Sequence, residues 1–575
     1  MGNSKIHYAI ISVFLILVFI QALYGTYDNS LTVDEACYVG VGKYLINTGD
    51  FTYNALNYHP PLSFYINSFF LYFIDIDINL FDPADCAKNK LIFHSGYNPR
   101  MMLLLVRLPI IIMSLILAVY VFIWASSLYG KKAGYLALFL YAFSPIIISQ
   151  AGLATTDFPA TFFIFITSYY FWKMLKFKSR KYVFLTAIFF GFAQLTKITS
   201  LVLIPIYLII ASVYLYRKRI SSRFAIGSFA IIFLITFIIV FLGYGFQFQT
   251  LSDSLQDYYS GRFKEEIDKR IHNDILNRLA THIFKEVPLP MSSYVASTIN
   301  MAYQSTRGVE NFIMGKLFIK TPWYFQIVVF LLKTPLSMLL LLFFTIILFK
   351  KIKTPKKDSL GHYLIVMVIV GIVVLFLNNR LTSGVRHIAP IYPFLFVFIS
   401  NIVNLRPKRK NSRVLFKIAM TIILLHYLLT SILVAPHYLA YFNELAGGPK
   451  NGYKFLVLSN LDIGQDLPGL KKFMDNNNIK KIQLSYHGSA DPADYGINYE
   501  LMPTPIFDPW HPNYSKYPKE YRYDCRKREG YVAVSVTYLH NLFLPNKSCY
   551  DWLQGYEPIA QIGYSINVYN VSKKS

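Results

Sequence analysis

The sequence lacks the motifs that bind a nucleotide or hold a catalytic metal. It has no Walker motif and no glycine-rich nucleotide loop, so it gives no support for ATP or a nucleotide sugar as the energy source. It also has no HExxH motif, no paired-histidine spacing and no dense aspartate cluster. We therefore expect no required cofactor and no metal site, and we keep a divalent metal as the alternative.

Acidic residues are scarce as well. Asp and Glu together number 31, against 56 Lys and Arg, and the formal net charge is +25. Such an excess is usual in nucleic-acid-binding proteins, but these basic stretches belong to no recognisable nucleic-acid-binding fold. We expect no nucleic-acid partner.

Cysteine is also rare, and its placement is informative. The four cysteines are Cys37, Cys86, Cys525 and Cys549, and none lies in a long apolar run. Four cysteines allow three pairings, and four unpaired thiols are the alternative. Cys525 with Cys549 is the favoured pairing, because both lie in the same C-terminal region.

Long hydrophobic runs, in contrast, are abundant. The chain of 575 residues is 54% hydrophobic and 17% aromatic, with a mean hydropathy of +0.39. About eleven apolar runs have roughly the 17 to 25 residues needed to cross hydrocarbon. They lie near 7–24, 102–128, 133–150, 158–173, 182–197, 199–216, 224–245, 327–349, 362–378, 386–404 and 415–434. The sequence therefore predicts a polytopic α-helical membrane protein with about eleven transmembrane helices.

Lys and Arg gather in every second loop between these runs. Positive charge near helix ends sets the orientation of a membrane protein, so the basic loops are predicted to be cytoplasmic. With an odd number of spans, the N-terminus is then cytoplasmic and the C-terminus external, in a multi-pass protein of the cell membrane. The first run lacks a small-residue cleavage site and is interpreted as a retained anchor. The basic loops hold Lys131 and Lys132; Lys176, Lys178, Arg180 and Lys181; Arg217, Lys218, Arg219 and Arg223; Lys350, Lys351, Lys353, Lys356 and Lys357; and Arg406, Lys408, Arg409, Lys410 and Arg413.

Three regions on the predicted external side are large. Two are loops, at about 25–100 and 247–321, and the third is the tail at 436–575. The first loop contains two short apolar helices, at 34–46 and 61–73, that suit the membrane interface. The second contains the charged amphipathic helix GRFKEEIDKRIHNDILNRLATHIF. Strand-like runs in the tail predict a small external α/β domain at 436–575, beside a transmembrane domain at 1–435.

Carboxylates occur at two points on the predicted external side. Asp34 and Glu35 follow the first span, where Thr32 and Glu35 fit a helix capping box. A cap does not explain Asp34, which at the membrane surface can act as a general base. Asp157 lies between the third and fourth spans and is also a candidate N-cap. Two carboxylates from different helices on one side of the membrane are more informative than either alone.

Cationic residues lie at the outer ends of three spans. They are Lys197, Lys333 and Arg386, the last followed by His387. A charge in or near hydrocarbon is costly, so each is a functional candidate, with snorkelling to the lipid headgroups as the alternative. Facing the same side as two carboxylates, they suggest a pocket for an anion, and a lipid phosphate can enter it sideways from the bilayer.

In order and topology these motifs resemble the polytopic GT-C glycosyltransferases that use lipid-phosphate sugars, namely the protein O-mannosyltransferase and aminoarabinose transferase branch. The resemblance covers nearly the whole chain and favours a prokaryotic member. Ile463 stands where many members have Trp, and the second large loop is too short for the β-trefoil insertion of eukaryotic members. The resemblance is carried by Asp34-Glu35, the stretch from Gly49 to Leu62 ending His59-Pro60-Pro61-Leu62, Asp157, Lys333-Thr334-Pro335, Arg386-His387 with Pro390 and Pro393, Tyr441-Phe442-Asn443-Glu444, Ser459-Asn460-Leu461-Asp462 and Gly464-Gln465-Asp466-Leu467.

The resemblance implies an inverting glycosyltransferase. The donor would be a polyprenyl- or dolichyl-phosphate sugar, and the acceptor a hydroxyl of a protein, lipid or glycan. Asp34 would be the general base, with Glu35 and Asp157 positioning the acceptor or the sugar. Tyr58 and His59 would bind substrate, and no metal would be needed. The leaving phosphate would be held by Lys197, Lys333, Arg386 and His387.

Two other functions stay open from the sequence. A secondary transporter usually shows inverted repeats and midplane charges in broken helices, and neither is found here. A non-catalytic envelope scaffold would use the tail as its working part.

Overall fold

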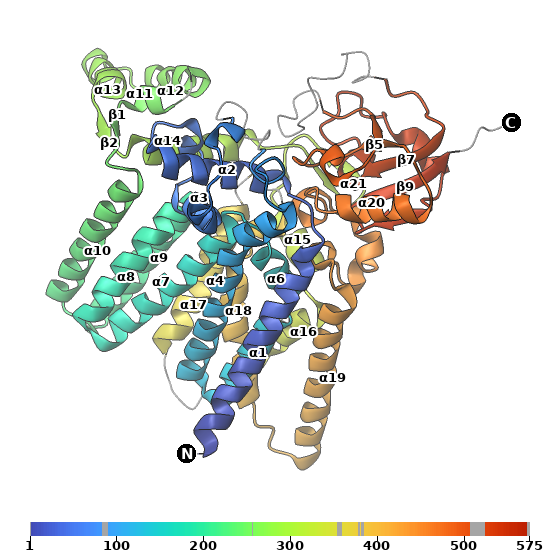
Figure 1. Cartoon of the computed structure of the whole chain (residues 1–575). Coiled ribbons are helices and arrows are strands. Elements are labelled where there is room, and N and C mark those ends of the chain that lie inside the picture. The colour runs from blue at the N-terminus through green and yellow to red at the C-terminus, as the bar shows by residue number, and fades with distance from the viewer. Residues whose placement is uncertain are drawn as a thin grey trace.

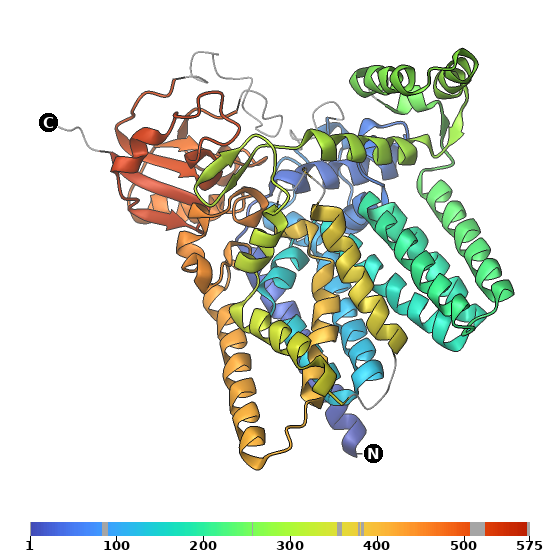
Figure 2. The same cartoon turned by 180° about the vertical axis from the view of Figure 1, so that it is seen from behind.

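The structure is a computed structural model that describes residues 2–82, 90–255, 257–353, 359–377, 380, 384–505 and 524–571. It is mostly helical, with long helices side by side in a bundle and a small sheet domain at one end (Figure 1). That end, made of the described residues within 28–98, 247–322 and 436–571, is called the loop face below. The N-terminus lies at the opposite end of the bundle (Figures 1 and 2).

All eleven predicted spans are helical, two of them as bent pairs. Among the described residues, six helices are long and apolar enough to cross a membrane. The number of candidate spans is eight if each bent pair is counted as one span. The remaining three are α7, α8 and α18, which pack against the others, and α8 and α18 are also shorter, with 17 and 10 residues. By length and composition, the structure therefore has fewer candidate spans than the predicted eleven. The segments are α1 (Gly2–Tyr27), α4 (Pro99–Tyr129), α5 (Lys131–Ala142) with α6 (Pro145–Ala151), α7 (Asp157–Phe177), α8 (Arg180–Thr196), α9 (Leu203–Tyr216), α10 (Ser222–Gly243), α15 (Phe325–Lys333) with α16 (Leu336–Ile347), α17 (Ser359–Leu377), α18 (Ile391–Ser400) and α19 (Lys410–Val434).

Proline accounts for the two bends. It has no backbone N–H and starts helices well, so the chain breaks before it. Helices α5 and α6 meet at 62° just before Pro145, and α15 and α16 meet at 108° at Pro335. The Asn443 amide donates to the carbonyls of Leu331 and Thr334, which the second break leaves without helical partners.

The first large loop folds into the two short helices that the sequence predicts. Helix α2 (Val33–Thr48) packs on α3 (Leu62–Ser68), which continues into the 3₁₀ helix Phe69–Phe73. Their backbones come very close, because a Cβ atom on Gly42 would lie 2.2 Å from the carbonyl oxygen of Phe64. This contact holds α2, and with it Asp34, over the bundle.

The second large loop contains α11 (Leu251–Ser254), α12 (Asp257–Arg270), α13 (Asp274–Glu286) and α14 (Ser292–Arg307). The single amphipathic helix predicted here is wrong, since it is divided into α12 and α13. Asn273 causes the division, because its side chain caps α13 by accepting from the N–H groups of Ile275 and Leu276. Strand β1 (Phe248–Gln249) pairs with β2 (Leu289–Pro290), and β3 (Asn311–Ile313) with β4 (Lys316–Phe318).

The tail carries the predicted α/β domain. Helix α20 (Leu467–Asn476) precedes a five-stranded sheet of order β6-β5-β7-β9-β8. Strand β5 runs parallel to β6 and β7, and β9 is antiparallel to β7 and β8. Residues 436–466, before α20, form short turns that contact α6 and α15, and α21 (Val536–Leu539) follows β7. The strands are β5 (Ile482–Ser485), β6 (Tyr499–Leu501), β7 (Gly530–Ser535), β8 (Ala560–Ile562) and β9 (Ile566–Val571).

A disulfide joins Cys525 to Cys549 in this domain, which is the pairing favoured from the sequence. Both flank the sheet, and Cys549 is buried in a small apolar cluster with Val532 and Val534 of β7. Cys37 is also disulfide-bonded, so the alternative of four unpaired thiols is wrong. Cys86, the second of the four cysteines, lies outside the described residues.

Candidate active site

A cavity of about 810 Å³ opens on the loop face and brings together most of the predicted site residues. Its walls come from α2, the start of α7, the break after α8, the 3₁₀ turn Val385–His387, α14 and the tail. Two predicted residues, Glu35 and Lys333, are not part of its wall. The predicted residues that line it are Asp34, Tyr58, His59, Asp157, Lys197, Arg386 and His387.

Asp34 reaches this pocket from the first turn of α2. Its Oδ2 atom contacts Nη1 of Arg386, and the two side chains are 19% and 21% exposed. Both groups are therefore partly accessible from the cavity. Arg386 comes from a segment 352 residues away in sequence, so only the fold places the guanidinium against the carboxylate.

Asp157 and Lys197 form a second ion pair, buried deeper in the pocket. Lys197 Nζ lies 2.5 Å from Asp157 Oδ1, and both side chains are buried. Arg386 Nη1 is 3.9 Å from the other oxygen, Asp157 Oδ2. The four side chains therefore alternate in charge, in the order Asp34, Arg386, Asp157 and Lys197, and their formal charges cancel.

Tyr38 and His59, whose side chains are both uncharged near pH 7, complete this part of the pocket. Tyr38 OH lies 3.4 Å from His59 Nε2, and both line the cavity. Burial and the Lys197 ammonium lower the pKa of His59 to about 4, so its imidazole is neutral near pH 7. Burial and the Asp34 carboxylate raise the pKa of Tyr38, which therefore keeps its hydroxyl proton. Tyr38 was missed from the sequence, although it stands four residues after Asp34, on the same helical face.

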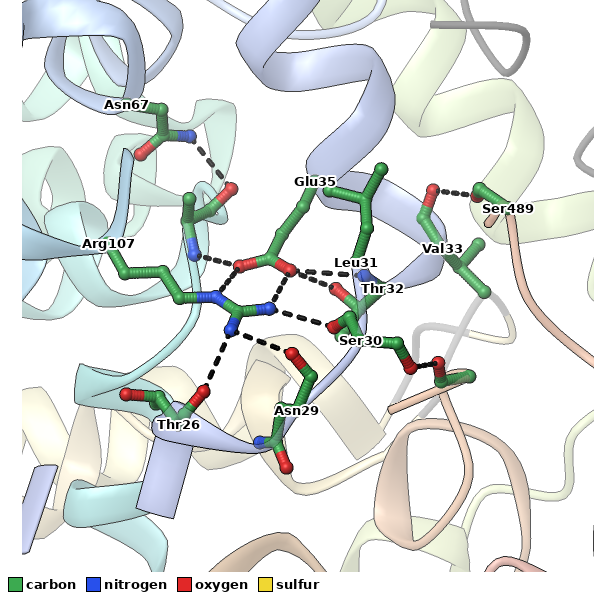
Figure 3. A network of polar contacts seen from close by, with 12 residues as sticks. Thr26, Asn29, Ser30, Leu31, Thr32, Val33, Glu35, Asn67, Arg107 and Ser489 are labelled. Atoms are coloured by element: carbon green, nitrogen blue, oxygen red, sulfur yellow. Dashed lines mark hydrogen bonds and ion pairs between the residues drawn. The ribbon is translucent and has the colours of Figure 1, made fainter. Parts of the chain in front are cut away.

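Glu35 points away from the pocket, so its predicted role at the substrate is not supported by its position. Its Oε1 and Oε2 atoms accept from Nε and Nη2 of Arg107, at 2.9 and 2.7 Å (Figure 3). Oε1 also accepts from the N–H of Ala154, and Oε2 from the N–H and hydroxyl of Thr32. The predicted capping box of Thr32 and Glu35 is thus present, and Arg107 is the charged partner of its glutamate.

Arg107 extends this contact into a network that holds the connection from α1 to α2. Its Nη atoms donate to the carbonyls of Thr26, Asn29 and Ser30 (Figure 3). Burial opposes ionisation of Glu35, but the Arg107 guanidinium and the hydrogen bonds outweigh it and lower the pKa of that carboxyl. An arginine inside the predicted span 102–128 was the signal in the sequence for this network.

Lys333 is also directed elsewhere and is not part of the pocket wall, so its position does not support its predicted role as a phosphate ligand. It ends α15, and the bend there turns its side chain into the segment after α19. Its Nζ atom donates to the carbonyls of Leu439 and Asn460, at 2.7 and 2.5 Å, and lies 4.3 Å from the ring centre of Phe442. Asn460 Oδ1 in turn accepts from the N–H of Val385, next to Arg386. Lys333 therefore contacts the pocket indirectly, because it binds the backbone of Asn460, whose side chain holds the backbone next to Arg386.

The far wall of the pocket comes from residues that the sequence did not single out for substrate contact. Asn300 and Gln304 of α14 line one side, and His487, Tyr538 and Phe543 of the C-terminal domain line the other. His487 Nδ1 lies 3.2 Å from Tyr538 OH. The tail is therefore part of the pocket.

A metal is not needed to balance the charges at this site. Both pocket carboxylates face cations, and within the described ranges no three His, Cys, Asp or Glu side chains are arranged to hold a metal ion. The sequence-based expectation of a metal-free site stays a prediction.

Lys197→Met should destabilise the protein by about 3–5 kcal/mol, because it leaves the Asp157 carboxylate buried without its ion-pair partner. Adding Asp157→Asn should restore most of this loss, since the second change removes the unpaired charge. The measurement is thermal unfolding of the purified protein in detergent. Lys176→Met, at the opposite end of α7, is the control. Equal stability of the single and double variants would show that this pair is not coupled.

Residues 102–242 match the sequence model of the dolichyl-phosphate-mannose-protein mannosyltransferase family. A comparison with curated proteins gave no match. The match confirms, over that stretch, the resemblance to the lipid-phosphate-sugar glycosyltransferases that the motifs indicated.

Three solved structures are among those to which this chain is similar. ArnT from Cupriavidus metallidurans bound to undecaprenyl phosphate has a TM-score of 0.48 at 12% identity, covering 99% of this chain and 98% of that one. The oligosaccharyltransferase AglB from Archaeoglobus fulgidus has a TM-score of 0.47 at 11% identity, covering 93% and 70%. The S. cerevisiae Pmt1-Pmt2 protein O-mannosyltransferase complex has a TM-score of 0.32 at 15% identity, covering 44% and 34%.

Proposed function

We propose that this chain, a membrane protein with a stretch of the dolichyl-phosphate-mannose-protein mannosyltransferase family, is an inverting GT-C glycosyltransferase. It moves a sugar from a polyprenyl- or dolichyl-phosphate carrier to an acceptor hydroxyl. The observation that carries this proposal is the pocket in which Asp34 faces Arg386 beside the pair of Asp157 and Lys197. A base, two cations and a position at the ends of membrane-crossing helices are what this reaction needs.

The reaction is a single displacement at the anomeric carbon. The acceptor oxygen forms a bond to that carbon while its proton passes to the Asp34 carboxylate. The bond between the carbon and the phosphate oxygen breaks, and its electron pair leaves with the carrier phosphate. Attack opposite the leaving group inverts the configuration of the carbon.

Lys197 and Arg386 are the groups placed to hold the phosphate. In the pocket they face carboxylates, so an entering phosphate competes with Asp34 and Asp157 for the same two cations. Cations that are already positioned stabilise the negative charge that grows on the leaving oxygen. When Arg386 moves towards the phosphate, its contact with the Asp34 carboxylate is lost. Asp34 can then accept a proton more readily.

The remaining pocket residues suit a sugar and its acceptor. Tyr38, Tyr58 and neutral His59 offer hydroxyl and imidazole groups on one side. His487 and Tyr538 offer similar groups from the C-terminal domain on the other. We assign the first set to the donor sugar and the second to the acceptor, which is a protein, lipid or glycan hydroxyl.

The proposed orientation follows the positive charge. The loops rich in Lys and Arg connect helices at the end of the bundle opposite the loop face (Figures 1 and 2). By the rule that positive loops stay inside, the N-terminus is cytoplasmic and the pocket and C-terminal domain are external. The carrier lipid then reaches the pocket from the outer leaflet of the cell membrane.

Sugar transfer from a panel of radiolabelled polyprenyl-phosphate sugars to native membrane extract tests the proposal. The purified protein should label an acceptor from one member of the panel, which would also identify the sugar. Labelling should not require ATP or an added divalent metal. A folded protein that moves label across proteoliposomes without covalent transfer would instead be a transporter.

A further inference from the structure

A second cavity opens on the loop face and shares no wall residue with the pocket that holds Asp34. It has a volume of about 1390 Å³ and lies between the end of α1, the start of α4 and the helix α20 of the C-terminal domain. Figure 1 shows α1 and α20 meeting on this side of the molecule. The buried Arg107 network lies between this groove and Asp34, because Arg107, Thr26 and Asn29 form part of its floor.

One wall of the groove is apolar and open to its surroundings. Tyr24 and Tyr27 of α1 are 58% and 66% exposed, and Met101 and Leu104 of α4 are also exposed. These residues lie at the loop-face ends of two helices long and apolar enough to cross a membrane. Tyrosines at such helix ends belong to the membrane interface, and the neighbouring apolar side chains meet lipid. This wall therefore faces the acyl chains of the adjacent leaflet.

The other wall carries cations that have no carboxylate partner. Arg100 of α4 and Lys472 of α20 are exposed, and among the described residues no carboxylate lies within ion-pair distance of either. Arg100 instead stacks over Tyr27, with its guanidinium carbon 5.7 Å from the ring centre. Two free cations therefore lie on one groove at the level of the lipid headgroups.

Most of the carboxylates in this groove are already engaged. Asp475 pairs with Lys471, and Asp494 lies 3.4 Å from His94. Asp466 accepts from the Ser565 hydroxyl at 2.6 Å. Burial raises the pKa of Asp466 to about 7, so this carboxyl is only partly charged near neutral pH.

Asp28 is exposed and is the other carboxylate of the groove wall. Against it stand Arg100 and Lys472, the cations of the groove wall with which no carboxylate of the described residues pairs.

We propose that this groove binds an anionic phospholipid of the leaflet at the loop face. Arg100 and Lys472 contact its phosphate, and its acyl chains lie along Tyr24, Tyr27 and Leu104. A soluble anion would use the cationic wall alone and leave the apolar wall uncovered. A lipid uses both walls, which is why the lipid is the favoured occupant. The proposal does not depend on the transfer reaction.

Binding of short-chain lipids to the delipidated full-length protein in detergent tests this site. Dioctanoyl phosphatidylglycerol should bind more tightly than dioctanoyl phosphatidylcholine, as measured by native mass spectrometry. The double variant R100Q/K472Q should bind phosphatidylglycerol about thirtyfold more weakly, because a basic residue near an anionic lipid contributes roughly fivefold in affinity. All the substituted side chains are exposed, so thermal unfolding should be unchanged.

The matched control is K450Q/K480Q, which removes the same charge from exposed positions of the tail outside the groove. It should bind phosphatidylglycerol as the unaltered protein does. The proposal is overturned if the control loses as much affinity as R100Q/K472Q, or if the unaltered protein does not distinguish the two lipids. It is also overturned if inorganic phosphate competes as well as the lipid does, since the apolar wall would then contribute nothing.

Discussion

Asp34→Asn should lower sugar transfer by roughly 10²–10⁴-fold, the usual contribution of a general base. The amide has the shape of the carboxylate and its oxygen can still accept from Arg386, but it cannot take a proton from the acceptor. Folding should be retained, because Asp34 is partly exposed and lies on the pocket surface rather than in the core. Single-turnover transfer from the labelled carrier identified in the panel is the measurement.

The structure supplies a matched control for this result. Asp28→Asn changes an exposed carboxylate six residues earlier, on the other side of the Arg107 network, and should leave transfer unchanged. Binding of the carrier sugar should persist in Asp34→Asn, since Lys197 and Arg386 remain and one competing negative charge is gone. Full activity of Asp34→Asn would remove Asp34 as the base. Loss of carrier binding together with loss of transfer would make Asp34 a binding residue.

The sequence identified segments that meet at one pocket, because hydropathy and charge report position along the membrane normal. Asp34, Asp157, Lys197 and Arg386 were each predicted at the end of a span, and each lines the pocket. The order of spans and loops places such residues at one level of the membrane. It does not say which way each side chain turns around its helix axis.

Glu35 shows that the direction of a side chain around its helix axis was missing from the sequence-based prediction. Successive residues of an α-helix point about 100° apart, so the side chains of Asp34 and Glu35 leave α2 in different directions. The residue that shares the face of Asp34 is Tyr38, one turn later, and it lines the pocket. The sequence alone did not reveal which of the two carboxylates faces inwards, because this depends on Arg107, 72 residues away.

Lys333 was misplaced for a different reason. Its span bends by 108° at Pro335, and a straight helix would have put the side chain in another direction. The proline was visible in the sequence, but the angle of a break is set by tertiary partners such as Asn443 and the carbonyl of Asn460. The contribution of the C-terminal domain to the pocket was unpredictable for the same reason, since it depends on how that domain docks.

Arg107→Met should destabilise the protein by about 3–5 kcal/mol, because it leaves the Glu35 carboxylate buried without its charged partner. The carbonyls of Thr26, Asn29 and Ser30 would lose their shared donor at the same time. The connection from α1 to α2 would then be held less firmly, and transfer should fall with it, since that connection sets the position of Asp34. Thermal unfolding in detergent and transfer kinetics on the same preparation measure the two effects.

Arg100→Met, two turns earlier on α4, is the control, because this exposed arginine lies outside the network and its loss should change stability by no more than about 0.5 kcal/mol. The double variant Arg107→Met with Glu35→Gln should recover much of the stability, because no unpaired charge then stays buried. It should not recover full transfer, because the three carbonyls still lack their donor. Full transfer in the double variant would mean that the network stabilises the fold without positioning Asp34, whereas equal stability of the single and double variants would mean that the buried charge is not the cause of the loss.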